Sequence, residues 1–185
     1  MSKAIIGLVG EMACGKETVK KYLEKKYGAK NARFSSILRD ILKRIDLPIN
    51  RDNLINLSTS LRQTFGQDIL AMAIAGDARN LDTDIVVIDG VRRMEDIKFL
   101  KEINGFMLIS MDAPIETRYK RMVSRNENIG DDKKTFEDFA SDHKRETELE
   151  IPLVMKNAKF SINNEGTFEE LYLQVDKIIA DILKN

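Results

Sequence analysis

The residues with the clearest chemical potential lie near the N-terminus, in the stretch GEMACGKET from Gly10 to Thr18. A loop that holds nucleotide phosphates has a glycine, four residues of any type, then glycine and lysine, and then serine or threonine. Backbone N–H groups of such a loop converge on phosphate oxygens, and its lysine neutralises them. The spacing therefore predicts a nucleotide-binding loop formed by Gly10, Glu11, Met12, Ala13, Cys14, Gly15, Lys16, Glu17 and Thr18.

Glu17 stands where the loop pattern has a hydroxyl, and this changes the expected metal chemistry. The hydroxyl normally binds the Mg²⁺ ion that bridges the phosphates. A carboxylate is also a hard oxygen ligand for Mg²⁺, although it adds negative charge beside the phosphates. Thr18 offers a hydroxyl one position later. Two hypotheses stay open. In the first, Glu17 or Thr18 takes over the metal role. In the second, Glu17 turns outward and the metal relies on substrate, water and other carboxylates.

A second group of chemical interest follows the apolar run DIVVID, which ends at Asp89. Ligands of parallel α/β sheets bind beyond the carboxyl ends of the strands, so Asp89 is predicted to organise magnesium there. The planar guanidinium of Arg92 matches the geometry of a phosphate and is predicted to hold a second, acceptor phosphate. The alternatives are a helix cap for Asp89 and an ion pair of Arg92 with Glu95 or Asp96.

Another candidate acceptor group follows the run ARF at residues 32–34. Ser35 and Ser36 stand just after this run and are candidates for helix caps. Arg39 lies one turn later and is predicted to face the same acceptor as Arg92.

Arginines also recur in the segment TRYKRMVSR, at positions 118, 121 and 125. Spacings of three and then four residues place all three on one face of a helix. We predict that Arg118, Arg121 and Arg125 neutralise negative charge at the site, and a solvated helix face is the alternative. His143 stands alone on a charged helical run, and we predict a solvated residue there.

The phosphate loop needs a strand before it and a helix after it, and the sequence offers this alternation repeatedly. Strands that alternate with helices predict a parallel sheet. A run as continuously apolar as IVVI predicts burial on both faces of that sheet. We therefore predict an α/β protein with three layers, α/β/α, an amphipathic last helix over residues 168–182, and five parallel strands within residues 4–9, 32–34, 84–89, 105–111 and 159–162.

Length and composition limit the classes of protein. A chain of 185 residues can bury one sizeable core, so we predict a single domain over residues 1–185 with a short helical lid at about residues 122–146. The 30 basic residues balance 30 acidic ones, which gives no reason to expect a nucleic-acid partner. Cys14 is the only cysteine, and no apolar run reaches the roughly 18 residues of a membrane span. We expect a cytoplasmic protein without a membrane partner, and the sequence carries no signal for an oligomeric state.

These motifs together resemble the P-loop nucleoside monophosphate kinase group, which includes adenylate kinase, dephospho-CoA kinase and the archaeal adenylate kinase-related proteins. The resemblance covers nearly the whole chain. It implies the P-loop NTP hydrolase fold, with ATP and Mg²⁺ as cofactors. It rests on the loop from Gly10 to Lys16, the segment from Ser35 to Arg39, LRQTFGQD at 61–68, DGVRR at 89–93 and RYKR at 118–121.

The resemblance also implies roles for single residues. The arginine of an Asp-Gly-x-Arg run binds the acceptor phosphate in this group, and by similarity this is Arg92. Lid-side arginines of the group bind the transferred phosphoryl group and correspond by similarity to Arg118, Arg121 and Arg125. The segment INNEGT resembles the loop that lines the donor adenine, which makes candidates of Asn163 and Asn164. Arg62 and Gln67 are candidates for the acceptor base or ribose. The short lid lacks cysteines, so no zinc-stapled lid is implied.

We therefore predict a kinase that transfers a phosphoryl group from ATP to a small phosphate-bearing acceptor, and a nucleoside monophosphate is the acceptor we expect most. Its expected catalytic residues are Lys16, Asp89, Arg92, Arg121 and Arg125, and its expected substrate-binding residues are Ser35, Ser36, Arg39, Arg62 and Arg92.

Two alternatives remain from the residues alone. A dephospho-CoA kinase would need a base near the second strand, where this chain has Ser35 and Ser36, with Asp40 the nearest carboxylate after them. A nucleotide-dependent switch or ATPase would need no acceptor. The absence of an Asn-Lys-x-Asp run disfavours a GTPase.

Overall fold

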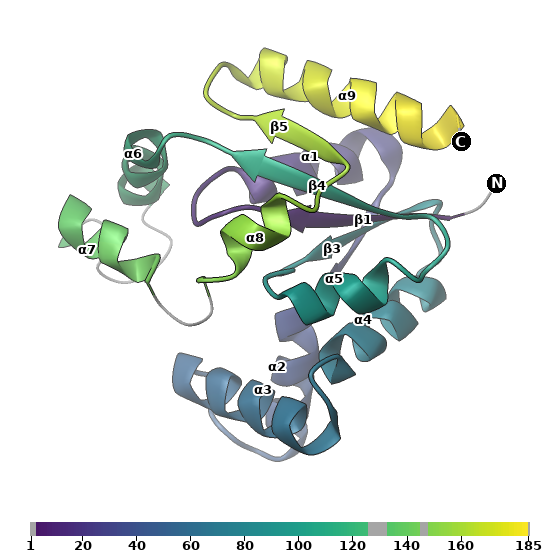
Figure 1. Cartoon of the computed structure of the whole chain (residues 1–185), viewed down its shortest axis with the longest axis vertical. Helices are drawn as coiled ribbons and strands as arrows, with labels where there is room; N and C mark the ends of the chain where they lie inside the picture. Colours follow the sequence, from purple (N-terminus) through teal and green to yellow (C-terminus); the bar gives the residue numbers. More distant parts are fainter. Residues whose placement is uncertain (1–2, 126–132, 145–147, 185) are drawn as a thin grey trace.

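The computed structural model describes residues 3–125, 133–144 and 148–184 and contains one sheet (Figure 1). Five strands, paired in parallel, lie in the order β2-β3-β1-β4-β5, with β1 in the middle. This sheet confirms the predicted α/β class. The strands are β1 Ala4–Val9, β2 Lys30–Arg33, β3 Ile85–Asp89, β4 Phe106–Asp112 and β5 Phe160–Asn163.

Helices cover both faces of this sheet and complete the predicted three layers. On β1, Ile5 and Val9 point into one apolar cluster, which α2, α4, α5 and α8 close. Ile6 and Leu8 point into the other, which α1 and α9 close. Strand side chains alternate between faces, so a fully apolar strand is stable only when both faces are covered. The helices are α1 Lys16–Tyr27, α2 Phe34–Arg44, α3 Arg51–Phe65, α4 Ile69–Asn80, α5 Met94–Leu100, α6 Ile115–Arg125, α7 Phe136–Asp142, α8 Ile151–Met155 and α9 Phe168–Lys184.

The junction of β2 and α2 differs from the sequence prediction. The strand ends at Arg33, and Phe34, which is 7% exposed, begins α2 directly. The N-cap residue is Arg33, and no side-chain hydrogen bond caps the helix. The predicted capping role of Ser35 and Ser36 is therefore wrong, since both lie inside the first turn of α2.

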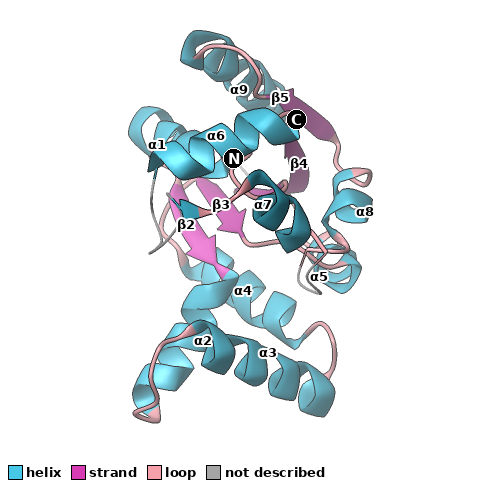
Figure 2. Cartoon of the chain, turned by 90° about the vertical axis from the view of Figure 1, so that its left-hand side faces the viewer, coloured by secondary structure: helices cyan, strands magenta, loops and turns pink. Residues whose placement is uncertain are grey.

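Two helical units extend beyond the sheet. α2 and α3 project from the rest of the molecule, as the side view of Figure 2 shows. α6 and α7 lie on the side toward which the arrowheads of β1 and β4 point in Figure 1, that is, beyond the carboxyl edge of the sheet. Asn50 caps α3, because its side chain accepts a hydrogen bond from the backbone N–H of Asn53. α2 follows β2 directly, so its first residues lie at the carboxyl edge of the sheet.

The predicted lid at residues 122–146 is only partly described. It contains the end of α6 and the whole of α7, whereas its residues 126–132 and 145–146 lie outside the described part of the chain. The single domain and its lid thus stay predictions. Within the described residues, no helix combines the length and the apolar character needed to cross a membrane.

α1 and α9 are joined at the surface by one carboxylate. Asp176 on α9 accepts hydrogen bonds from the hydroxyls of Tyr22 and Tyr27, both at 2.8 Å, and from the ammonium of Lys26 at 2.6 Å. The ring of Tyr22 stacks on Tyr172 with centroids 4.0 Å apart. Slight burial raises the pKa of Asp176, but the bonds from Lys26, Tyr27 and Tyr22 outweigh it and hold the pKa below its ordinary value.

We predict that Asp176→Asn lowers the Tm at neutral pH and that its difference from the wild type shrinks as the pH falls. A carboxyl group with a lowered folded pKa stabilises the fold above its unfolded pKa and loses this effect as the pH falls through the folded value. Thermal unfolding at several pH values between about 7 and about 3 measures the difference. Glu24→Gln, which changes an exposed carboxylate of α1, is the control. Parallel Tm curves for wild type and Asp176→Asn would contradict the prediction.

Candidate phosphate-binding site

The loop between β1 and α1 has the backbone shape of an anion site. Ala13 and Gly15 have positive φ angles of 60° and 107°. Left-handed residues in a turn let successive N–H groups point into one concavity, which suits phosphate oxygens. Gly10 cannot carry a side chain, because a Cβ atom there would lie 2.4 Å from the carbonyl oxygen of Met111 and 2.6 Å from Cys14 Sγ. Both glycines of the motif are therefore favoured on steric grounds, Gly15 by its positive φ angle and Gly10 by the lack of room for a Cβ atom.

Lys16 lies across this loop. Its Nζ donates hydrogen bonds to the carbonyl oxygens of Gly10 at 2.5 Å and Glu11 at 3.1 Å, and lies 3.6 Å from Cys14 Sγ. The side chain is partly buried, and Cys14 is fully buried. The predicted loop residues are thus one compact unit with a positive charge above the backbone.

Asn164, from the segment after β5, supports the loop from behind. Its Nδ2 donates a hydrogen bond to the carbonyl oxygen of Cys14 at 2.8 Å, and the residue is 6% exposed. A Cβ atom on Gly15 would lie 2.1 Å from this Nδ2, so the glycine permits the contact. Asn163 is exposed, and its Oδ1 accepts a hydrogen bond from the N–H of Glu165. A shallow hollow adjoins it, lined by Asn163, Glu165, Gly166, Glu170, Leu173 and Gln174.

Two carboxylates meet on one ammonium group at the edge of the loop. Lys20 Nζ lies 2.6 Å from Glu17 Oε2 and 2.9 Å from Asp89 Oδ2. Asp89 is the last residue of β3, and its Oδ2 also lies 3.2 Å from Arg33 Nε. Thr18 occupies the first turn of α1, where its N–H bonds the carbonyl of Gly15. The structure therefore brings Glu17 and Asp89 together, although they are far apart in sequence.

The charges in this cluster reinforce one another. Burial raises the pKa of Asp89, but the hydrogen bond and charge of Lys20, helped by the charges of Arg33 and Lys16, hold it below its ordinary value. Burial lowers the pKa of Lys20, yet its bonds to Glu17 and Asp89 raise it above the ordinary value. Asp89 and Lys20 are accordingly both ionised at neutral pH, despite being mostly buried.

The donor set suits a hard cation only in part. Mg²⁺ commonly binds through one or two carboxylates together with substrate phosphates and water. Glu17 and Asp89 supply oxygens of this kind, and both contact the same group, Lys20 Nζ. Within residues 3–125, 133–144 and 148–184, no group of three or more His, Cys, Asp or Glu side chains forms a protein-only metal site. The residues thus fit a metal ion that arrives with a phosphate ligand.

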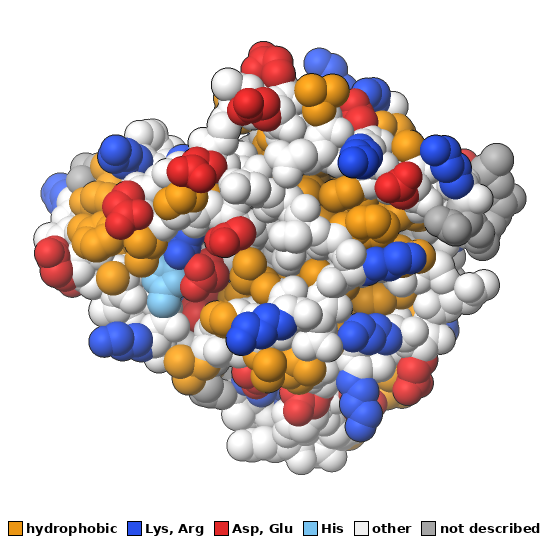
Figure 3. Space-filling model, turned by 45° about the horizontal axis from the view of Figure 1, so that its top comes forward, with side chains coloured by type: hydrophobic (Ala, Val, Ile, Leu, Met, Phe, Trp, Pro, Cys, Tyr) orange, Lys and Arg blue, Asp and Glu red, His pale blue; other side chains and the backbone are white. Residues whose placement is uncertain are grey.

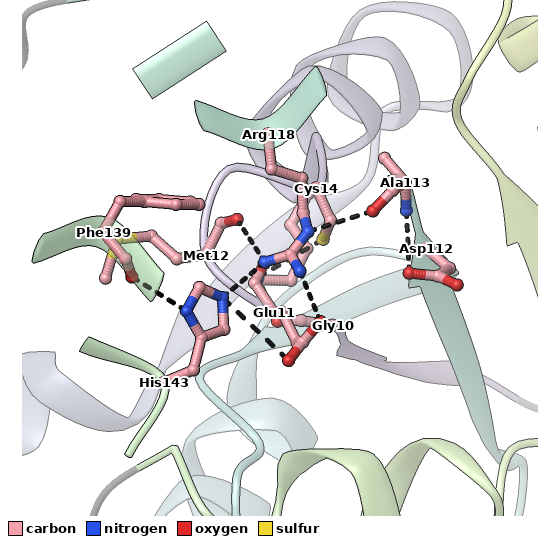
Figure 4. Close-up of polar contacts among 10 residues, drawn as sticks. Gly10, Glu11, Met12, Cys14, Asp112, Ala113, Arg118, Phe139 and His143 are labelled. Atoms are coloured by element: carbon pink, nitrogen blue, oxygen red, sulfur yellow. Dashed lines mark hydrogen bonds and ion pairs between the residues drawn. The ribbon is translucent and has the colours of Figure 1, made fainter. Parts of the chain in front are cut away.

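Arg118 connects the loop to α6 and α7 (Figure 4). This residue is 4% exposed, and its Nη2 lies 2.8 Å from Glu11 Oε2. Its Nε donates to the carbonyl of Ala113 at 3.0 Å, and its Nη1 lies 2.6 Å from Nε2 of His143. His143 Nδ1 lies 2.9 Å from the carbonyl oxygen of Phe139. The prediction of a solvated His143 is therefore wrong, since both ring nitrogens have partners.

These contacts assign roles to the two ring nitrogens of His143. The carbonyl oxygen of Phe139 only accepts, so Nδ1 is the donor in that contact. Arg118 has only donors, so Nε2 is the acceptor in the other contact. His143 thereby helps to orient the guanidinium toward Glu11.

The three arginines of α6 differ in environment. Arg118 is buried, Arg121 is partly buried and Arg125 is exposed at the end of the helix. The Nη1 atom of Arg121 is buried and has no hydrogen-bond partner among the residues that the structure describes. A buried donor without a partner is costly, and a ligand oxygen would satisfy it. This atom is a specific reason to place an anion near α6.

The predicted acceptor residues lie around the ends of β2 and β3. Arg92 is about half exposed, with 48% of its side chain accessible, and its Nη1 lies 2.7 Å from Glu148 Oε1. The expected alternative pairing with Glu95 or Asp96 is therefore replaced by Glu148. On α2, Arg39 and Ser36 are exposed and Ser35 is partly buried.

Arg62 is linked to this group through Asp96, which also accepts a backbone hydrogen bond from Arg92. It is buried, and its Nη2 lies 2.9 Å from Asp96 Oδ1, while Nη1 bonds the carbonyl of Gln67. Burial raises the pKa of Asp96, and the charge of Arg62 lowers it only in part. The pair thus ties α3 to α5 in the interior, and a substrate role for Arg62 stays an untested prediction.

Sequence reasoning missed four residues of this region: Lys20, Arg33, His143 and Glu148. A signal existed for Lys20 alone, because it lies on the same face of α1 as the buried residues Val19 and Leu23. Arg33 and Glu148 each meet a partner 56 positions away. His143, the C-cap of α7, contacts Phe139 in that helix and Arg118 in the preceding one.

Comparisons with known proteins agree with this geometry. Residues 9–140 match the sequence model of a family described as the AAA domain. A UPF0200 protein of Methanocaldococcus jannaschii is 28% identical over 183 residues, which cover 98% of this chain and 91% of that protein. A shikimate kinase from Bacteroides thetaiotaomicron superposes with a TM-score of 0.61 at 11% identity, covering 98% of this chain and 99% of its own. A gluconokinase from Sinorhizobium meliloti gives 0.60 at 12%, covering 99% and 94%. The fold is thus P-loop kinase-like, a coarser assignment than the nucleoside monophosphate kinase group.

We predict that Asn164→Asp lowers the free energy of unfolding by about 1 to 3 kcal/mol, because it removes a buried donor and sets a carboxylate against the Cys14 carbonyl. The loop loses its support in this variant, so ATP affinity should fall as well. Urea unfolding and calorimetric titration with ATP measure the two effects. Asn163→Asp, at the exposed neighbour, should change the stability by less than about 0.5 kcal/mol. Equal stability of the two variants would refute the supporting role of Asn164.

Proposed function

The chain belongs to the AAA domain family, whose sequence model matches residues 9–140, and on this premise we propose that it transfers the γ-phosphoryl group of ATP to a small phosphate-bearing acceptor. The acceptor that we propose is a nucleoside monophosphate. The single observation that carries the proposal is the joint placement of Lys16 over the loop and Asp89 at the end of the adjacent strand, close enough for the Lys16 charge to lower the pKa of Asp89 along with Lys20 and Arg33.

The donor side consists of the loop and its lysine. Loop N–H groups and Lys16 bind the β- and γ-phosphates of ATP, and this binding holds the reacting phosphorus in position. Glu17 and Asp89 are the residues that would hold Mg²⁺. When bound, this ion neutralises charge on the phosphate oxygens. The segment after β5, with its hollow beside Asn163, is the proposed place of the adenine.

The acceptor side is built on two neighbouring strands. Arg33 and Asp89 are register partners across β2 and β3, so the start of α2 and the segment after Asp89 lie beside each other. A ligand that reaches Arg92 from this side replaces its ion pair with Glu148, in which the Arg92 side chain is 48% exposed and the Glu148 side chain 10%. An acceptor phosphate competes with Glu148 for Arg92 because a bidentate phosphate contact is the stronger one. Arg39 on α2 is the second proposed contact.

The transferred group is neutralised from α6. Arg121 has a buried Nη1 without a partner among the described residues, and we assign it to the phosphoryl oxygens. Arg125 lies one turn further along the same helix. Acidic and basic side chains are interspersed over the face drawn in Figure 3, so recognition of an anion depends on this local group rather than on a general field.

Acceptor class is tested by a thermal-shift panel of nucleoside monophosphates and coenzyme A precursors, because a bound acceptor raises the Tm by mass action. Phosphoryl transfer is then measured by ADP release. A kinase consumes ATP only when the acceptor is present. Steady ATP hydrolysis without any acceptor would instead indicate a switch or an ATPase.

We predict that Lys16→Met loses most phosphoryl transfer, by about a hundredfold or more, while the protein still folds. The lysine supplies charge to the phosphates and contacts only loop atoms in the structure. Turnover is measured beside thermal unfolding. Lys21→Met, an exposed position of α1, is the matched control and should retain activity. Full activity in a folded Lys16→Met protein would exclude the phosphate-loop mechanism.

We also predict that Arg92→Ala raises the acceptor KM or lowers turnover by about tenfold or more, since a charge-assisted hydrogen bond contributes about 1.5 to 3 kcal/mol. ATP affinity should stay nearly unchanged. Arg79→Ala, which removes an exposed arginine of α4, is the control. Equal losses of ATP and acceptor binding would show that Arg92 contacts the donor or supports the fold.

A further inference from the structure

The loop region contains a buried cation that the proposed reaction does not use. Lys20 is 7% exposed, and its ammonium lies between a carboxylate of the loop and one of the sheet. The distances are 2.6 Å to Glu17 Oε2 and 2.9 Å to Asp89 Oδ2. Glu17 and Asp89 are the two residues expected to bind a divalent cation. The ammonium of Lys20 is thus already bound to both.

A lysine is rarely buried to this extent unless its charge is paired. Here the two carboxylates compensate the desolvation, and the folded protein keeps the ammonium charged. The two partners differ in freedom, because the side chain of Glu17 is 51% exposed and that of Asp89 is 9% exposed. Asp89 is therefore the fixed end of the contact, and Glu17 is the end that can turn away.

We propose that Lys20 is a built-in competitor of the divalent cation, which keeps metal off Glu17 and Asp89 until nucleotide phosphates draw the ammonium away. This inference rests on the proposed function in one respect, the use of Asp89 for a metal. Lys20 is then a positioning residue that makes metal binding depend on nucleotide. A divalent cation that approaches Asp89 Oδ2 in the free protein meets both Lys20 and Arg33, whose positive charges repel it.

The same contact also has a plain structural explanation, a buried ion pair that joins α1 to β3. The two explanations differ in one measurable quantity, the affinity of the nucleotide-free protein for a divalent cation. Competition requires this affinity to rise when the charge of Lys20 is removed. A purely structural pair requires only a loss of stability.

The experiment measures Mn²⁺ binding to the nucleotide-free protein by electron paramagnetic resonance, in which free and bound Mn²⁺ are distinguished. Lys20→Gln keeps a hydrogen-bond donor for Asp89 without the charge, and Lys20→Met keeps an unbranched side chain, one heavy atom shorter, without charge or donor. Removing a charge this close should tighten Mn²⁺ binding by about tenfold or more in either variant. Lys21→Gln, the exposed neighbour on α1, removes the same net charge and should bind Mn²⁺ as the wild type does. Lys20→Arg keeps the charge and should also match the wild type.

A second substitution assigns the site. In Lys20→Gln/Asp89→Asn the gain in Mn²⁺ affinity should disappear. The proposal is overturned if the folded neutral variants bind Mn²⁺ no more tightly than the wild type, or if the gain survives the change of Asp89. Thermal unfolding of each variant confirms that a folded protein is measured. Mn²⁺ binding does not depend on turnover, so failure of the kinase proposal in the ADP assay would leave this result readable on its own.

Discussion

The register of three neighbouring strands is the constraint on which the candidate site depends. Asp89 pairs with Leu8 on β1 and with Arg33 on β2. Because the strands are parallel, the phosphate loop, the Asp89 carboxylate and the start of α2 all emerge at one edge. A slip of one residue would turn Asp89 to the other face of the sheet and separate it from Lys20. The chemistry of the site therefore depends on the apolar strand packing that sets this register.

The sequence predicted this framework well because its signals are local. The buried run IVVI, the glycine spacing of the loop and the helical spacing near Phe168 each belong to one short segment. The strand boundary at Phe34 was missed because Ala32 and Phe34 are both buried, and this spacing of two residues is also that of a strand. The serine caps failed for the same reason, since they depended on that boundary.

The charged partners could not be predicted in the same way. Arg62 pairs with Asp96 over 34 positions, and Lys20 pairs with Asp89 over 69. The Arg92 contact spans 56 positions, and the His143 contact joins two consecutive helices over 25. Sequence spacing identifies a residue able to hold a phosphate or a metal. It does not tell whether a neighbouring charge already holds that residue.

The hydrogen bond from Asn164 to the Cys14 carbonyl has a consequence for folding during synthesis on the ribosome. It spans 150 positions, so the loop motif leaves the ribosome long before the residue that supports it. Contacts of such separation form late, because the chain between them must first be ordered. The nascent chain consequently lacks the Asn164 support of its loop until the segment after β5 has been made and β5 has joined the sheet. The shape of a loop near the N-terminus thus depends on a segment that follows it by most of the described chain.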